Sequence, residues 1–242
     1  MPPTLPQIEA ARARIRGAAI RTPLVRLNID DAPAEIYLKL ENLQPIGSFK
    51  LRGAANAMAQ LSPDQLARGV LTASTGNMAQ GTAWMARRLG VACTVVAPVT
   101  APAIKLAAIE RLGGRVIKVP FERWWQTFQE RAYPNVDATF IHAFDDPAVI
   151  AGNGTIGLEI LEDLPDVAAI VIPWGGGGLA CGGLARGRVR DLLPFGPPGE
   201  RVPDAVEQQC AGLVLVGHAH QVDVGDDAEQ PVDLAVLDPH GY

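Results

Sequence analysis

The sequence predicts an α/β protein in which helices cover a parallel sheet on both faces. Runs typical of β-strands alternate with helical runs over the first 183 residues, and the connections between them are short. The composition agrees, because 48% hydrophobic and 19% charged residues in a chain of 242 suit a sizeable core and argue against global disorder.

The strands and helices are predicted in order from hydrophobic spacing and from the residues that stop each element. The expected strands cover 35–41, 69–74, 91–97, 115–119, 139–144 and 168–173. The expected helices cover 77–89, 101–112, 122–132 and 156–164. Met78, Met85 and Leu89 recur at helical spacing, Gly113 stops the second helix, and Pro165 closes the last one.

The final segment, 184–242, differs in composition from the rest of the chain. No Ser or Thr follows Thr155, no Lys follows Lys118, and proline and glycine become frequent around 193–203. Only weak strand-like runs such as 213–216 remain. We therefore expect an atypical, poorly packed tail where an α/β fold would continue its alternation.

The charge and cysteine content exclude several classes of function. With 21 Lys and Arg against 26 Asp and Glu the net charge is 21 − 26 = −5, and the absence of a basic cluster argues against a nucleic-acid partner. Cys93, Cys181 and Cys210 are too widely spaced for a CxxC motif or a disulfide framework, which favours a reducing compartment. The N-terminal residues lack the apolar segment of a signal peptide, so we expect a cytoplasmic protein.

One uncharged stretch, 167–185, has 19 residues, close to the length of a membrane span. It contains Pro173 and six glycines, four of them consecutive, which would disrupt a spanning helix. We therefore expect a buried strand followed by a glycine loop, and no membrane contact.

Lys50, in the motif GSFKLRGA, is the first candidate for chemistry. It stands between Phe49 and Leu51, and these apolar neighbours favour partial burial. A buried lysine is readily neutral and nucleophilic, which covalent chemistry with an aldehyde cofactor requires. An ordinary surface lysine is the alternative that this motif alone leaves open.

Two further motifs follow predicted strands. In STGNMAQ, at 74–80, backbone N–H groups at a helix start could bind a substrate carboxylate, or Ser74 or Thr75 could cap the helix. In GGGG, at 175–178, four glycines at the carboxyl end of a strand let N–H groups converge on a phosphate. A flexible loop is the alternative for these glycines.

Two other patterns are weaker. GNGTIG, at 152–157, fits the dinucleotide-binding fingerprint, but no clean strand precedes it, so we do not expect NAD or FAD. His218 and His220 lie in the atypical tail without an obvious third ligand, so we expect no metal site there.

Taken together, GSFKLRGA, STGNMAQG and GGGGL resemble the motifs of the serine/threonine dehydratases, which are fold-type II pyridoxal-phosphate-dependent enzymes of the tryptophan synthase β-like group. KLAAIERLGGRV and AGNGTIGLEILEDLPDV add to a resemblance that covers about residues 8–183. It implies a three-layer parallel-sheet sandwich in two domains. The large domain would comprise 1–52 and 146–183 and be incomplete, and a smaller inserted domain would comprise 53–145.

The resemblance also implies residue roles. Lys50 would hold pyridoxal 5'-phosphate covalently and then remove the substrate α-proton, with Phe49 against the pyridine ring and Asn77 on the phenolic oxygen. The cofactor phosphate would lie against Gly175, Gly176, Gly177, Gly178 and Leu179. The substrate carboxylate would lie against Ser74, Thr75, Gly76, Asn77 and Met78.

The implied activity is dehydration and deamination of L-serine or L-threonine to a 2-keto acid and ammonia, by a chain expected to form a homodimer. A β-replacement enzyme of the cysteine synthase type and an inactive remnant remain as alternatives. The β-replacement motifs usually read like SVKDR and SGNTG, whereas the motifs here are dehydratase-like.

The sequence departs from the family pattern at three places. Met78 stands where histidine is usual and cannot donate a hydrogen bond, which affects substrate preference. Thr75 stands where similar serine racemases carry serine, which favours dehydration over racemisation. The usual hydroxyl partner of the pyridine nitrogen and the metal-binding carboxylates of some relatives belong to the part that does not match, so we predict no metal.

Overall fold

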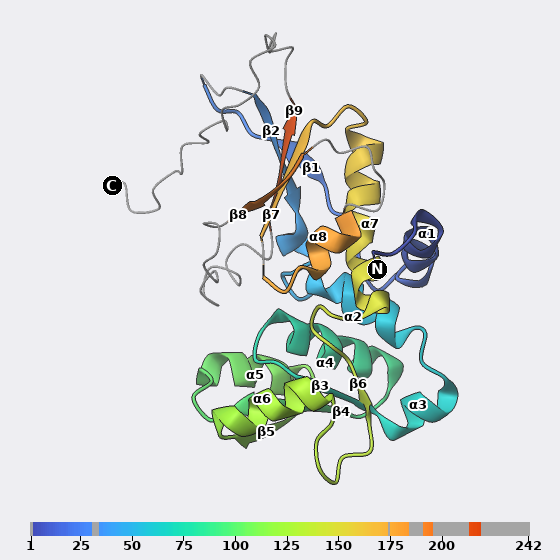
Figure 1. The fold of residues 1–242 in the computed structure, drawn as a ribbon, viewed down its shortest axis with the longest axis vertical. Helices are drawn as coiled ribbons and strands as arrows, with labels where there is room; N and C mark the ends of the chain where they lie inside the picture. Colours follow the sequence, from blue (N-terminus) through green and yellow to red (C-terminus); the bar gives the residue numbers. More distant parts are fainter. Residues whose placement is uncertain (1, 31–33, 174, 184–190, 196–212, 219–242) are drawn as a thin grey trace.

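The strands of the structure, a computed structural model, form two sheets that lie one above the other along the molecule (Figure 1). The structure describes residues 2–30, 34–173, 175–183, 191–195 and 213–218, the last two segments as backbone strands only. Among these residues one sheet has the order β1-β2-β9-β7-β8 and the other the order β5-β4-β3-β6. Helix α2 (Lys50–Met58) lies between the two sheets.

The four-stranded sheet is parallel throughout and is covered on both faces. Its strands are β3 (Val70–Ala73), β4 (Cys93–Pro98), β5 (Arg115–Val119) and β6 (Thr139–Phe140). Val70 and Val95 pack into the core on the side of α2, whereas Leu71 and Val96 pack with Trp124 on the other side. This alternation places helices on opposite faces: α4 (Asn77–Leu89) and α5 (Ala103–Arg111) against α6 (Phe121–Glu130). The predicted layered α/β arrangement is confirmed here.

The five-stranded sheet is mixed rather than parallel. Its strands are β1 (Leu24–Arg26), β2 (Glu35–Leu40), β7 (Ala169–Pro173), β8 (Asp191–Phe195) and β9 (Leu213–His218). β7 is parallel to β8, while β9 is antiparallel to both β2 and β7, and β1 is antiparallel to β2. The short connection between β1 and β2 can join only antiparallel strands, because a parallel pair needs a crossover of a dozen residues or more.

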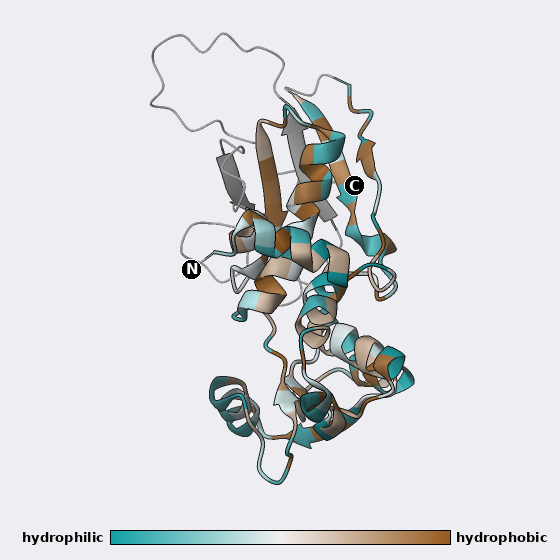
Figure 2. Cartoon of the chain, turned by 90° about the vertical axis from the view of Figure 1, so that its right-hand side faces the viewer, coloured by the Kyte–Doolittle hydropathy of each residue, from teal (hydrophilic) through white to brown (hydrophobic). Residues whose placement is uncertain are grey.

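One face of this mixed sheet is packed by two helices, α7 (Pro147–Asp163) and α8 (Gly178–Gly183). Ile156 and Leu179 from these helices meet Ile170 and Ile172 of β7 in a shared core. Figure 2 colours β7 hydrophobic along most of its length, as its buried position requires. The remaining described helical elements are α1 (Leu5–Arg14), η1 (Glu41–Leu43) and α3 (Pro63–Arg68).

Most predicted elements lie where the spacing placed them, and α4 and β5 have the predicted bounds. The helix predicted at 156–164 was wrong at its start, because α7 begins at Pro147. Asp146 caps it by accepting hydrogen bonds from the amides of Ala148 at 2.7 Å and Val149 at 3.2 Å. The GNGTIG pattern therefore lies inside a helix, and the exclusion of a dinucleotide-binding loop is confirmed.

The predictions for the tail fall largely outside the described residues. The strand-like run at 213–216 is confirmed as part of β9. His220 and Cys210 lie outside the described residues, and His218 is described only as the last backbone position of β9. In the described part of the chain we find no helix with the length and apolarity of a membrane span.

The glycines of α7 serve close helix packing. A Cβ added at Gly152 would overlap the carbonyl oxygen of Arg52 and lie 2.8 Å from Gly53 Cα, so α7 crosses α2 at backbone contact. A Cβ added at Gly154 would lie 2.9 Å from the carbonyl oxygen of Gly182 in α8. These helices can approach this closely only because the crossing points lack side chains.

We expect Gly152→Ala to lower the free energy of unfolding by about 1–3 kcal/mol, because the added methyl group meets backbone atoms that cannot move aside. Gly157→Ala in the same helix is the matched control. Its Cβ would lie 3.5 Å from Gly183, an ordinary contact, and alanine favours the helix by up to about 1 kcal/mol. Urea unfolding of both variants measures the difference. Equal stability of the two variants would contradict the close crossing.

Candidate active site

Lys50 is the first residue of α2 and is half-buried at the junction of the two sheets. Gly47, with φ of +71°, turns the chain into this helix. The Lys50 ammonium group donates a hydrogen bond to the carbonyl oxygen of Ala143 at 3.1 Å and lies 5.3 Å from the centre of the Phe49 ring. The predicted partial burial of Lys50 is therefore present, and a neutral carbonyl is one of its contacts.

Phe49 is buried in the core of the mixed sheet, with 4% of its surface exposed. It packs with Ile172 of β7 and Leu179 of α8. The buried ring therefore anchors the backbone immediately before Lys50 to this core. The side chain of Leu179 is also in this core, so only its backbone can border the glycine loop.

The segment 74–78 lies between the end of β3 and the first turn of α4, as predicted. The Ser74 hydroxyl accepts a hydrogen bond from the Gly76 amide at 3.2 Å. A Cβ on Gly81 would lie 3.5 Å from Leu51 Cα, so the first turns of α4 run beside the start of α2. The Met78 side chain is 2% exposed in the core, so its backbone alone could meet a ligand.

The segment His142–Asp145 contacts both Lys50 and the glycine loop. The sequence did not predict a role for it. The strand predicted at 139–144 was wrong from Ile141 onward, because β6 ends at Phe140. His142 Nδ1 accepts hydrogen bonds from the amides of Phe144 at 3.3 Å and Asp145 at 2.8 Å, which bends the chain away from the sheet. The bend presents the Ala143 carbonyl to Lys50.

The same bend brings Phe144 onto the glycine loop. A Cβ added at Gly176 would overlap the Phe144 ring, and one at Gly178 would lie 2.7 Å from the Phe144 carbonyl oxygen. Gly177 has φ of +78°, which favours glycine independently. Glycine is therefore required at Gly176 and Gly178 by contact and is favoured at Gly177 by the backbone angle.

A cavity of about 320 Å³ borders the glycine loop. That volume falls in the usual range for small-molecule sites. Its walls come from α6, the bend after β6, α7, the loop and α8. The lining residues are Phe128, His142, Phe144, Asp145, Ile150, Gly176, Gly177, Gly178 and Cys181.

A buried network of four charged side chains anchors α2 just behind Lys50. Arg52 bonds both carboxylate oxygens of Glu41 at 2.8 Å and both of Glu159 at 2.7 and 2.8 Å. Lys39 adds bonds to Glu159 at 2.7 Å and to the Thr22 carbonyl at 2.5 Å. The two positive and two negative charges balance, so each charge in this dry interior is paired.

Burial lowers the pKa of Arg52, but the hydrogen bonds and charges of Glu41 and Glu159 outweigh it and hold that pKa above its ordinary value. Arg52 is therefore a fixed cation. The signal in the sequence was the pair Lys39 and Glu41, two residues apart at the end of the predicted strand 35–41, which would point to the same side among apolar neighbours. Charged residues rarely occupy such positions without partners.

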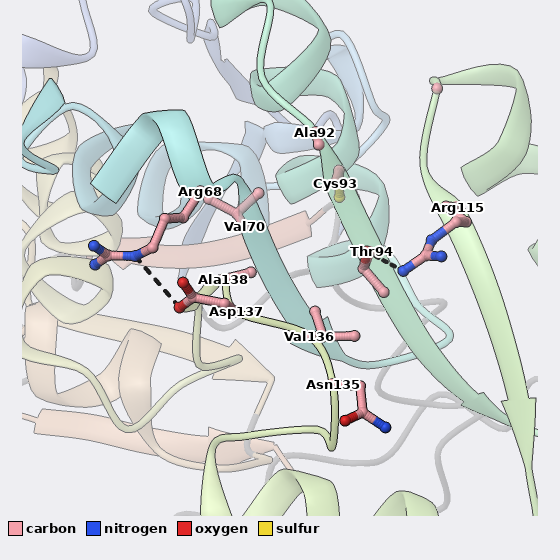
Figure 3. Close-up of a pocket in the computed structure, with 11 residues that line it drawn as sticks. Arg68, Val70, Ala92, Cys93, Thr94, Arg115, Asn135, Val136, Asp137 and Ala138 are labelled. Carbon is pink, nitrogen blue, oxygen red and sulfur yellow. Dashed lines mark hydrogen bonds and ion pairs between the residues drawn. The ribbon is translucent and has the colours of Figure 1, made fainter. Parts of the chain in front are cut away.

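A second cavity, of about 370 Å³, opens at the amino ends of β3, β4 and β5 (Figure 3). Arg115 donates to the Thr94 hydroxyl at 3.3 Å there, and Arg68 lies 3.5 Å from Asp137. Lys50 instead contacts Ala143, which follows the carboxyl end of β6. Burial raises the pKa of Cys93 to about 12, so its thiol stays protonated and is a poor nucleophile. We therefore do not place the chemistry at this cavity.

The comparisons with known proteins agree with the motifs. The family of pyridoxal-phosphate dependent enzymes matches residues 15–190, and the chain belongs to this family. L-threonine ammonia-lyase of Thermotoga maritima is 45% identical over 183 residues, which are 74% of this chain and 45% of that protein. A catabolic L-threonine dehydratase of Staphylococcus aureus is 43% identical over 74% of this chain and 53% of its own length.

The chain is also similar in fold to a solved structure. The crystal structure of serine racemase from Dictyostelium discoideum superposes with a TM-score of 0.75 at 35% identity, over 81% of this chain and 66% of that one. The predicted fold class and the resemblance to the dehydratase group are confirmed. The chain spans about half the length of the curated relatives it matches.

The residues around the loop fit the cofactor of this family. Pyridoxal phosphate needs a lysine for its aldehyde and a backbone cradle for its phosphate. Lys50 and the glycine loop supply these groups from either side of the His142–Asp145 bend, and side chains at Gly176 and Gly178 would be blocked by Phe144. Within the described residues, no group of three or more His, Cys, Asp or Glu is arranged to hold a metal ion.

Proposed function

We propose that this chain carries the catalytic lysine and phosphate cradle of a pyridoxal-phosphate-dependent ammonia-lyase, which converts L-threonine or L-serine to a 2-keto acid and ammonia. One observation carries the proposal: Lys50 and the glycine loop contact the same four-residue bend, His142–Asp145. The names of the two similar threonine lyases support the substrate class.

Each motif has a role in this proposal. When bound, the cofactor supplies the electron sink for the negative charge that develops at the substrate α-carbon. Lys50 Nζ holds the cofactor and then takes the α-proton. Backbone N–H groups of 175–179 would hold the phosphate, Asn77 would bind the phenolic oxygen, and Phe49 would lie against the pyridine ring.

The substrate carboxylate is proposed to lie at 74–78, where Ser74 and Thr75 offer hydroxyls and Asn77 and Met78, in the first turn of α4, offer backbone N–H groups just after the Ser74–Gly76 hydrogen bond. This segment stands at the carboxyl end of β3 beside the first turn of α2, which brings it near Lys50. The aromatic side chains Phe128 and Phe144 line the cavity beside the glycine loop.

The wider organisation is also proposed. The large domain comprises 1–52 and 146–183, the smaller domain 53–145, and 184–242 forms the tail. We further propose a cytoplasmic homodimer that acts on a small amino acid, with no metal, nucleic-acid or membrane partner.

The test is keto-acid release by the purified full chain with pyridoxal phosphate. We expect 2-oxobutyrate from L-threonine or pyruvate from L-serine, each with equimolar ammonia. Sulfide consumption with O-acetylserine would instead support a β-replacement enzyme. Absence of both reactions in a folded, cofactor-loaded chain would support an inactive remnant and reject the proposal.

A further inference from the structure

His142 is buried, with 4% of its surface exposed, in the wall of the cavity beside the glycine loop. Its Nδ1 accepts hydrogen bonds from the Phe144 and Asp145 amides. An imidazole can accept at Nδ1 only when that nitrogen carries no proton, so this geometry requires the neutral tautomer with hydrogen on Nε2.

These two bonds determine where the neighbouring groups point. They tie the residues two and three positions ahead back to His142, as an Asx turn does with a side-chain oxygen. Ala143 lies inside the tied segment, and its carbonyl accepts from Lys50 at 3.1 Å. Phe144 lies on the other side of the segment and packs on the glycine loop.

The surroundings of the imidazole are aromatic at close range and charged farther out. The Phe128 ring centre is 4.6 Å away and the Phe144 ring centre 4.8 Å away. The charged groups that act on it are Arg131 and Asp145, which form an ion pair at 2.6 Å, Asp146 at the start of α7, and Lys50. Burial, and then the charge of Arg131, lowers the pKa of His142 below its ordinary value.

We propose that His142 is a positioning residue for Lys50: its neutral imidazole holds the bend that aims the Ala143 carbonyl at the lysine and seats Phe144 on the glycine loop. This inference rests on the proposed role of Lys50. The imidazole itself acts through the bend and touches no reacting atom.

The proposal carries a pH dependence with a definite sign. Because the folded chain disfavours the charged imidazole, the stability from His142 is complete above its ordinary pKa and is lost as the pH falls through the lower, folded pKa. Protonation at Nδ1 would set its N–H against the amides of Phe144 and Asp145. The bend would then open and move the Ala143 carbonyl away from Lys50.

Two substitutions of His142 distinguish the contribution of its hydrogen-bond acceptor from that of its aromatic ring. His142→Asn keeps an acceptor that can bond the amides two and three residues ahead, whereas His142→Phe keeps an aromatic ring without an acceptor. Leu106→Ala, on the buried face of α5, is the control for general destabilisation. Trace acetylation of the cofactor-free full chain by acetic anhydride, read by peptide mass spectrometry, measures the reactivity of the Lys50 amine, with exposed Lys118 as internal reference.

We expect Lys50 in His142→Phe to be acetylated about tenfold faster relative to Lys118, because its amine is released from the Ala143 carbonyl. Covalent uptake of pyridoxal phosphate, fixed by borohydride, should weaken about tenfold in the same variant. His142→Asn and Leu106→Ala should stay within about twofold of wild type in both measurements. Wild type should also show a step in Lys50 acetylation at acidic pH that His142→Asn lacks.

The proposal is overturned if His142→Phe matches wild type, if Leu106→Ala reproduces its effect, or if the acidic step persists in His142→Asn. The last comparison needs only wild type and His142→Asn, so it decides the matter even if His142→Phe does not fold. Acetylation requires no turnover. If wild type releases no keto acid but the variants show the expected acetylation pattern, the proposed function alone is rejected. If wild type releases keto acid but His142→Phe leaves Lys50 acetylation unchanged, the role of His142 alone is rejected.

Discussion

Replacing Lys50 by alanine should abolish covalent cofactor uptake and reduce keto-acid release by about 10²–10⁴-fold or more. In the proposed reaction the variant loses both the amine that holds the aldehyde and the base that takes the α-proton, and a positioned base alone contributes about 10²–10⁴-fold. The measurement is the absorbance spectrum with pyridoxal phosphate before and after borohydride, followed by peptide mapping.

The chain is well suited to this mapping because it has only four lysines: Lys39, Lys50, Lys105 and Lys118. Lys39 is fully buried and bonded to Glu159, so it is not accessible to an aldehyde. Lys118→Ala, on the exposed side of β5, is the control and should keep the wild-type spectrum. A borohydride-fixed cofactor on any lysine other than Lys50 would contradict the assignment.

Replacing Arg52 by methionine should cost about 3–5 kcal/mol of the free energy of unfolding. Methionine fills a similar volume, but Glu41 would lose its ion pair, and Lys39 would remain as the buried cation of the network, bonded to Glu159. The expected loss is measured by urea unfolding. Because Arg52 follows Lys50 by two residues in α2, cofactor uptake should weaken as well.

Two comparisons identify the buried charges as the cause. Arg12→Ala removes a half-exposed ion pair with Glu162 and should change the stability by about 1 kcal/mol or less. Adding Glu41→Gln to Arg52→Met removes one uncompensated charge and should recover part of the loss in a double-mutant cycle. Equal stability of Arg52→Met and Arg12→Ala would show that the network is not held as the structure describes.

The parts of the fold that follow local spacing were predictable from the sequence. α4 and β5 have the predicted bounds because apolar periodicity and stop residues act within the element itself. The early start of α7 was missed, since glycines within 152–157 lower helix propensity and only the packing against α2 and α8 makes them favourable. The strand direction in the mixed sheet depends on pairing between distant segments, which periodicity does not encode.

The candidate site was predictable where a motif carries its own chemistry, as for Lys50 and the glycines at 175–178. What joins them was not predictable. His142 acts through a hydrogen-bonded bend, and Arg52 acts through carboxylates contributed by η1 and α7. Neither role has a characteristic spacing, because the partners meet only after the chain has folded.

The crossing between α2, α7 and the bend after β6 has a consequence for the order of folding. The four-stranded sheet uses only residues 70–140, so its pairings can form while the rest of the chain is still being synthesised. Lys50 meets a carbonyl 93 residues later in the chain, and Arg52 meets a carboxylate 107 residues later. Closing such long loops is slow, so a nascent chain should carry a folded small sheet well before its lysine is in place.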